Sequence, residues 1–172
     1  TSEPIIMDPV YVSANIGIRG SNEKITLTAI DNTQVILVQD DNSRANSSDI
    51  IQKVVSIFKE YFDTTTAKIG MVVNITEITN KILTIQGVST FYTSRTDQSN
   101  SYIEGLSLVV WNPVYTSDIT QTTQNYKLPN FKFPFFDNIE KLSSRLKVVR
   151  SSELTNVLSG VDQSVSAPTG TY

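Results

Sequence analysis

Residues 47–62 read SSDIIQKVVSIFKEYF, and this stretch decides the fold class. Its apolar residues recur three and four positions apart, so they share one side of a helix and leave the charged residues on the other. Ser47 or Ser48 is suited to cap the first turn, and Asp49 sits favourably at the positive end of the helix dipole. We therefore predict an amphipathic helix with an apolar face that packs on a sheet.

The residues before this helix indicate strands. Residues 10–18 alternate between apolar and polar side chains, which is the period of a half-buried strand. Residues 25–30 and 35–38 predict two further short strands, with a turn at residues 31–32.

The residues after it predict a second, shorter helix. Asn74, with Glu77 three positions on, resembles a capping box, and Gly87 is suited to the left-handed conformation near the helix end. Residues 88–94 and 106–111 then read as a pair of strands joined by a polar turn. The simplest fold that buries all these faces is α+β, a small antiparallel sheet with two helices on one face, formed by a compact domain of residues 1–113.

Residues 114–172 differ in composition and predict a linker followed by an aromatic and basic C-terminal arm. Residues 116–124 are polar without a period, and residues 145–148 alternate as one more strand. Residues 128–136 hold four of the seven Phe residues together with two prolines, which disfavour a helix and a central strand. Four exposed Phe side chains would promote aggregation, so they are buried either on the chain's own domain or, as we favour, against a neighbouring subunit.

Charge is distributed unevenly along the chain. Residues 1–125 carry eight basic and thirteen acidic groups, a balance of −5, whereas residues 126–150 carry six basic and two acidic groups, a balance of +4. We therefore expect the basic segment to bind an acidic surface. We expect these interface residues: Phe131, Lys132, Phe133, Phe135, Phe136, Arg145 and Lys147.

The composition excludes several kinds of chemistry. The 172 residues are 39% hydrophobic, enough for a core, and include no Cys and no His. Disulfides, thiolate nucleophiles, Cys/His zinc sites and imidazole acid–base catalysis are therefore excluded in this chain alone. We predict a non-enzymatic protein with no catalytic residues, no cofactor and no metal, and expect neither nucleic-acid nor membrane binding. Because the sequence begins without Met, we expect a piece of a longer protein.

Two alternatives stay open. An enzyme that uses only Asp, Glu, Lys, Ser or Tyr would need an apolar pocket with a strongly shifted pKa. A receptor- or carbohydrate-binding virion module would expose aromatic rings on the sheet around Tyr92, Tyr102 and Trp111, although aromatic residues on strands commonly pack only against each other.

Four stretches resemble the C-terminal part of the bacteriophage baseplate J-like family, which includes T4-type baseplate wedge subunits. They are residues 3–12, 49–62, 78–88 and 128–138. The resemblance implies a structural role in the virion. Such subunits are assembled in the bacterial cytoplasm, pair within each wedge of a contractile tail baseplate and join neighbouring wedges into a ring. It also implies partners, namely other wedge subunits and copies of the chain itself.

Overall fold

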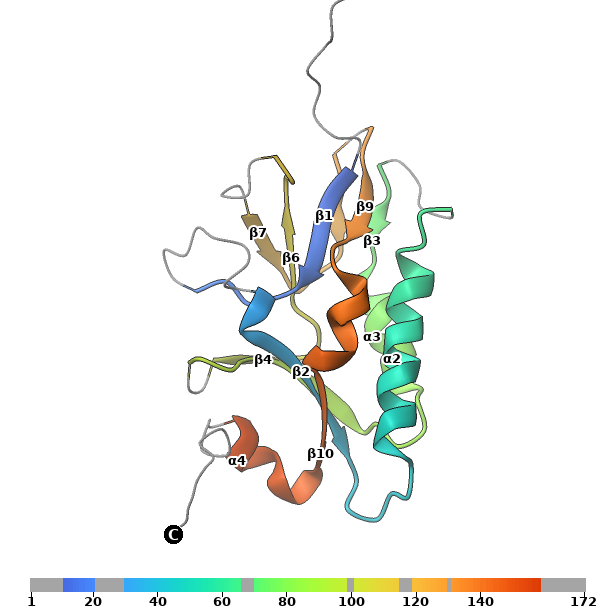
Figure 1. Ribbon diagram of the computed structural model, residues 1–172, viewed down its shortest axis with the longest axis vertical. Coiled ribbons are helices and arrows are strands. Elements are labelled where there is room, and N and C mark those ends of the chain that lie inside the picture. The colour runs from blue at the N-terminus through green and yellow to red at the C-terminus, as the bar shows by residue number, and fades with distance from the viewer. Residues whose placement is uncertain are drawn as a thin grey trace, which may run out of the picture.

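The computed structural model describes residues 11–20, 30–65, 70–98, 101–114, 119–129 and 131–158, and these residues have the predicted α+β architecture (Figure 1). The elements are β1 (Tyr11–Ile16), β2 (Thr33–Gln39), α2 (Ser47–Tyr61), β3 (Val72–Val73), α3 (Ile75–Leu83), β4 (Thr90–Arg95), β5 (Tyr102–Glu104), β6 (Leu108–Trp111), β7 (Ile119–Thr122), β8 (Tyr126–Lys127), β9 (Phe133–Phe136), the 3-10 helix η1 (Ile139–Arg145), β10 (Leu146–Arg150), the 3-10 helix η2 (Ser151–Glu153) and α4 (Leu154–Leu158).

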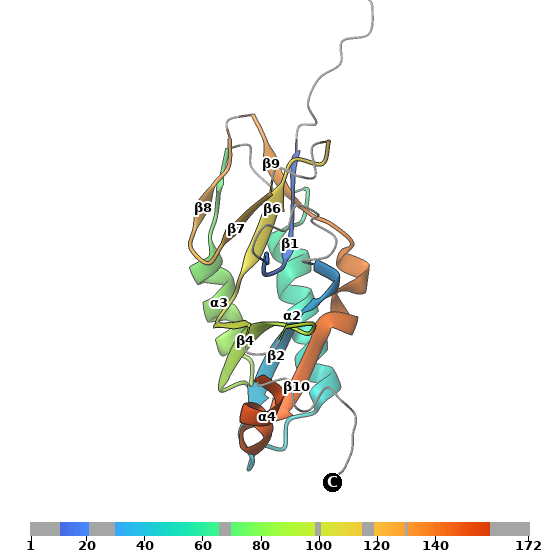
Figure 2. The same cartoon turned by 90° about the vertical axis from the view of Figure 1, so that its left-hand side faces the viewer.

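Within the described residues, the strands form two four-stranded sheets and a two-stranded ribbon. The first sheet has the order β7-β6-β1-β9 and the second the order β10-β2-β4-β5, while β3 pairs with β8. Both sheets are mixed, because β9 runs parallel to β1 and β10 runs parallel to β2. Figure 1 shows the β1 sheet above the β2 sheet, with α2 beside them, and Figure 2 shows α3 on the same molecule turned by 90°.

One core joins both sheets to the two longer helices. β1 contributes its alternate residues Val12, Ala14 and Ile16 to this core, and α2 and α3 contribute their apolar faces. β2 is buried on both faces. Val35 and Leu37 lie in this core, whereas Ile36 and Val38 pack on the other face in a cluster that includes Val157 of α4. A strand covered on both faces reads as a continuous apolar run, as residues 35–38 do.

Both longer helices, α2 and α3, lie where the sequence predicts them, and the capping residue of α2 differs from the prediction. α2 begins at Ser47, but Asn46 rather than a serine caps it, because the Asn46 Oδ1 accepts from Ser48 N at 2.8 Å and Asp49 N at 3.3 Å. Asn74 caps α3 as predicted, accepting from Glu77 N at 2.9 Å.

Arg145 ties the two sheets together. Its guanidinium donates to Asn15 Oδ1 at 2.6 Å and to the Ile16 carbonyl in β1, and to the Thr33 carbonyl at 3.0 Å in β2. Burial lowers the pKa of Arg145 to about 10, which leaves the group charged at neutral pH. The predicted role of Arg145 at an interface is therefore corrected: its side chain serves the chain's own fold.

The predicted arm is also corrected. Its strands β7, β8, β9 and β10 pair with β6, β3, β1 and β2, so residue 113 does not separate two domains in the described part of the chain. Pro134 is compatible with β9 because β9 is an edge strand, where a missing N–H need not break a ladder. Residues 159–172 of the predicted arm lie outside the described residues.

The predicted pairing of residues 88–94 with residues 106–111 is wrong. β4 pairs with β2 and β5, and β6 pairs with β1 and β7. Gly105, whose φ is 92°, turns the chain at the end of β5. Two residues later the chain reaches the other sheet, where the Ser107 carbonyl accepts a hydrogen bond from Gly17 N at 3.1 Å. The strand predicted over residues 25–30 lies outside the described residues except for Ile30, which is not in a strand.

Candidate interaction surface

Exposed apolar side chains gather at the end of the molecule where β1 begins. Among the described residues, four of the six exposed large hydrophobic side chains belong to this end, on β3, on β9 and in the loops that follow β6 and β8. With two half-buried rings they form what we call the apical surface: Tyr11, Val72, Val114, Phe131, Phe133 and Phe135. Figure 1 shows this end at the top, where β1 and β9 begin.

Strand pairing assembles the rings of the apical surface. Tyr11 lies opposite Phe133 in the parallel ladder, and their ring centroids are 6.3 Å apart. Tyr11 also contacts Phe135 edge-to-face at 5.3 Å. Phe133 and Phe135 are two positions apart in β9 and therefore share a face of the sheet. Phe135 keeps 37% of its surface exposed.

The other face of β9 belongs to the core. Phe136 is 3% exposed, and its ring lies 5.4 Å from that of Phe58 and 5.2 Å from that of Phe62. The predicted interface role of Phe136 is therefore corrected, because its ring packs against α2.

Phe131 is the most exposed of the large hydrophobic residues, at 79%, and has an unusual backbone conformation. Its φ of 70° lies in the left-handed region, which costs a non-glycine residue about 1–2 kcal/mol. The neighbouring Lys132 carbonyl accepts from Gly70 N at 2.7 Å, which fixes the loop to the chain before β3. A strained, exposed ring at a loop tip is a feature of binding sites rather than of a core.

Two lysines lie among the described residues of the apical end. Lys127 and Lys132 are the charged residues within the described parts of β1, β3, β6, β7, β8, β9 and the loops at residues 112–114, 123–125, 128–129 and 131–132. Lys127 Nζ donates to the Gly70 carbonyl at 2.6 Å and the Leu128 carbonyl at 3.2 Å, and carbonyl groups do not neutralise its charge. The two lysines therefore place basic groups beside the exposed apolar side chains.

The outer edge of β9 is poorly suited to pair with a strand of a partner chain, so a partner would contact this strand mainly through side chains. Asp137 N donates to the Ala14 carbonyl at 3.0 Å, so the odd-numbered residues of this segment direct their backbone groups toward β1. Pro134 faces the outer edge and offers no N–H there, which blunts the edge as natural sheets commonly do.

The structure thus brings together four of the seven predicted interface residues: Phe131, Lys132, Phe133 and Phe135. Lys147 lies apart from them, half-buried in β10. Sequence reasoning missed Tyr11, whose alternating strand marked it only as a solvent-facing position, and missed Val72 and Val114, which carry no sequence signal for an interface.

The aromatic residues of the sugar-binding alternative do not form one platform. Tyr92 and Tyr102 pack edge-to-face at 5.9 Å on the β2 sheet, and Tyr102 is exposed. Trp111 lies in the β1 sheet and is only 5% exposed, packed with Ile30, Val109 and Ile119. The expectation of an exposed Trp111 is therefore wrong.

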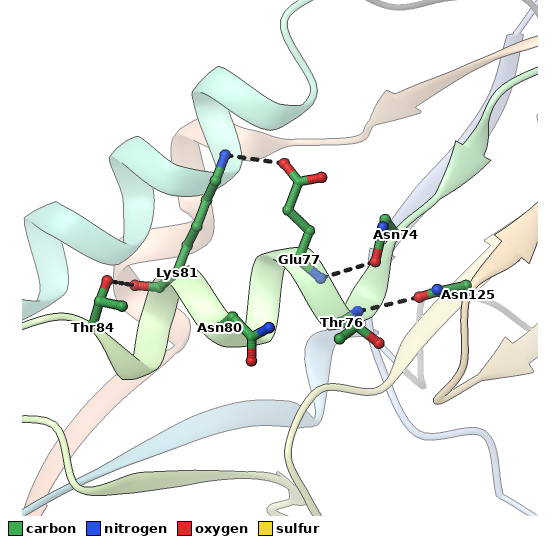
Figure 3. Close-up of a pocket in the computed structure, with 7 residues that line it drawn as sticks. All are labelled: Asn74, Thr76, Glu77, Asn80, Lys81, Thr84 and Asn125. Carbon is green, nitrogen blue, oxygen red and sulfur yellow. Dashed lines mark hydrogen bonds and ion pairs between the residues drawn. The ribbon is translucent and has the colours of Figure 1, made fainter.

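An open polar hollow of about 540 Å³ lies over α3 (Figure 3). Glu77 and Lys81 form an ion pair at 3.2 Å along its wall. Asn74 and Asn125 accept from the first-turn amides of α3, Asn125 from Thr76 N at 3.2 Å. Those amides are thus occupied by side chains, so this helix end is not arranged to hold an anion.

The described residues contain no group of three or more His, Cys, Asp or Glu residues placed to hold a metal ion. No helix within them is long and apolar enough to cross a membrane. Comparisons of the chain with protein-family models, curated proteins and solved structures found no match.

Proposed function

We propose that this chain is a non-enzymatic structural subunit that assembles by burying its apical surface against partner chains. The observation that carries this proposal is the gathering of exposed apolar side chains, led by Phe131, at one end of the molecule. Complete burial of a Phe side chain contributes about 1.5–3 kcal/mol, and aromatic residues with a basic rim are typical of the centre of protein interfaces.

The resemblance to the baseplate J-like family supports a more specific proposal. The chain is a wedge subunit of a contractile phage tail baseplate, located in the virion, and its partners are other wedge subunits and copies of itself. Baseplate subunits must hold one arrangement and rearrange when the tail contracts. A surface of exposed rings on a rigid sheet, held by side-chain contacts rather than by strand addition, suits an interface that can exchange partners.

Sedimentation equilibrium of the chain over a range of concentrations tests the proposal. We expect reversible self-association of the wild type and at least tenfold weaker association of the double variant Phe131→Ser/Phe135→Ser. Leu83→Ser is the matched control, because Leu83 is 41% exposed at the end of α3, away from the apical surface. A monomeric wild type would contradict self-association through this surface, and equal weakening by the control would contradict the role of the two Phe rings.

The Tyr92–Tyr102 pair supports a second candidate, a carbohydrate- or receptor-binding virion module. The exposed Tyr102 ring on the short edge strand β5 offers an aromatic contact for a sugar. A glycan-array signal that Tyr102→Ala abolishes and Phe131→Ser leaves intact would favour this candidate over assembly.

A further inference from the structure

The outer side of β5 is an open edge of the β2 sheet. β5 is the last strand in the order β10-β2-β4-β5, so one side pairs with β4 and the other has no partner strand among the described residues. Figure 1 shows β4, the neighbour of β5, in the lower of the two sheets, away from the end where β1 begins. This edge is therefore separate from the apical surface.

Alternate residues of β5 direct their backbone groups toward the open edge. Arg95 N donates to the Ser101 carbonyl at 2.8 Å, which marks a hydrogen-bonded position of the antiparallel β4–β5 ladder. Such positions alternate, so Ile103 also bonds β4, whereas Tyr102 and Glu104 direct their N–H and C=O groups outward. The edge thus offers two backbone donors and two backbone acceptors to another strand.

The sequence of β5 does little to prevent such pairing. Edge strands are commonly protected by Pro, by Lys or by a bulge, as Pro134 protects β9. β5 has none of these, and its register with β4 is regular. Tyr102 is 42% exposed, Glu104 is exposed, and a Cβ built on the next residue, Gly105, would meet no atom within 4 Å. The strand is three residues long, which limits pairing to a small and transient contact.

β5 is complementary to itself in one antiparallel register. When two copies pair about a two-fold axis at Ile103, Tyr102 of each copy lies opposite Glu104 of the other, and the two positions together exchange four backbone hydrogen bonds. The phenol is a donor and the carboxylate an acceptor, so the facing side chains also match. A register that places Glu104 opposite its own copy is disfavoured, because like charges directly opposite destabilise a sheet.

We propose that β5 pairs with β5 of a second copy in this register and joins the two β2 sheets into one continuous sheet. The inference goes beyond the proposed function, because it adds a second, two-fold site of self-association apart from the apical surface. A subunit that has two separate contacts with its own copies can join more than two of them.

One introduced cysteine tests the register, because the chain has no Cys of its own. Ile103→Cys places the two thiols at a non-hydrogen-bonded pair, where the Cα atoms lie about 4.5 Å apart, within the range of a disulfide. Ser101→Cys is the matched control on the same edge, because its two copies lie four positions out of register, about 13 Å along the strand.

Under mild oxidation we expect the disulfide-linked dimer to form at least tenfold faster with Ile103→Cys than with Ser101→Cys. Each rate is divided by the rate of alkylation by iodoacetamide, which corrects for the reactivity of the thiol. An amide spectrum that is unchanged away from β5 shows that each variant is folded.

Two substitutions at Tyr102, each made in the Ile103→Cys chain, test the facing pair by charge. Tyr102→Glu places a carboxylate opposite Glu104 twice in each dimer and should slow the corrected rate at least tenfold. Tyr102→Lys loses the same ring but faces the carboxylate with an opposite charge, so its rate should stay within threefold of Ile103→Cys alone. The comparison separates charge from loss of the ring.

Equal corrected rates for Ile103→Cys and Ser101→Cys, or for the two Tyr102 variants, would overturn the inference. If those rates are equal while sedimentation shows association that Phe131→Ser/Phe135→Ser weakens, the edge contact fails and the proposed function stands. If the cysteines react as expected while the Phe substitutions leave association unchanged, the edge contact stands and the role of the apical surface in self-association fails.

Discussion

Replacing Arg145 with Met is predicted to weaken the junction between the two sheets. The change removes the donor to the buried carbonyls of Ile16 and Thr33, whereas Asn15 Oδ1 keeps a second donor, Ile16 N, at 2.7 Å. Each unsatisfied buried acceptor costs about 1–3 kcal/mol, and repacking recovers part of the sum because methionine fills much of the same volume. We expect a loss of about 2–4 kcal/mol in the free energy of unfolding.

Urea unfolding followed by Trp111 fluorescence measures this loss, because Trp111 is the single Trp and is buried in the β1 sheet. For a chain of this size each kcal/mol corresponds to about 2–4 °C, so the melting temperature should fall by roughly 10 °C. Lys141→Met is the matched control, since Lys141 is an exposed basic residue on the same 3-10 helix. A loss below about 1 kcal/mol for Arg145→Met, or an equal loss for the control, would refute the role of the guanidinium in joining the sheets.

Two further predictions concern a glycine and a carboxylate. Gly87 has a φ of 100°, and a Cβ at this position would lie 2.6 Å from the Cβ of Ala45. Gly105 has a φ of 92°, but a Cβ at that position would meet open space. Gly87→Ala should therefore lower the melting temperature more than Gly105→Ala. Equal shifts of the two melting temperatures would show that the contact with Ala45 does not matter. Hydrogen bonds from Arg95 hold the pKa of Asp97 below its ordinary value of 3.8. The interaction therefore stabilises the folded protein above pH 3.8, and this stabilisation is lost as the pH falls through the lowered pKa of the folded state. The wild type should therefore be more stable than Asp97→Asn at pH 7, and the difference should shrink in urea titrations at decreasing acid pH; a difference that is constant with pH would contradict this.

Local periodicity predicted the elements whose signal is contained in a short stretch. The helix at residues 47–62 and the strand at residues 10–18 were found because burial of one face imposes a period on the sequence. The cap of α2 was misplaced by one residue, because Asn46 and Ser47 are both capable N-caps and only the backbone geometry distinguishes them.

Pairing between distant segments could not be predicted in the same way. The period of a strand indicates which of its faces is buried but not which strand lies beside it. The predicted pairing of β4 with β6 is wrong for this reason. The arm was misjudged because prolines excluded a central strand at residues 133–136 but are tolerated at the edge that β9 occupies. β10 lies beside β2 although more than a hundred residues separate them, and no local pattern indicates such a contact.

The candidate surface was predicted in part. Composition pointed to Phe131, Phe133 and Phe135, since a dense aromatic cluster must be covered by something. Tyr11 lies beside these rings because β1 and β9 pair in parallel, which the sequence does not indicate. Phe136 lies on the other face of the sheet because successive strand residues face opposite sides.

The central claim is that the apical surface becomes buried when this chain assembles. Amide hydrogen exchange of the wild type, measured at a concentration well below and one well above the association midpoint, tests it most directly. Peptides that cover residues 128–136 should exchange more slowly at the high concentration, while peptides from α3 should exchange equally at both. Equal exchange of residues 128–136 at the two concentrations, in a sample shown by sedimentation to be associated, would contradict the claim.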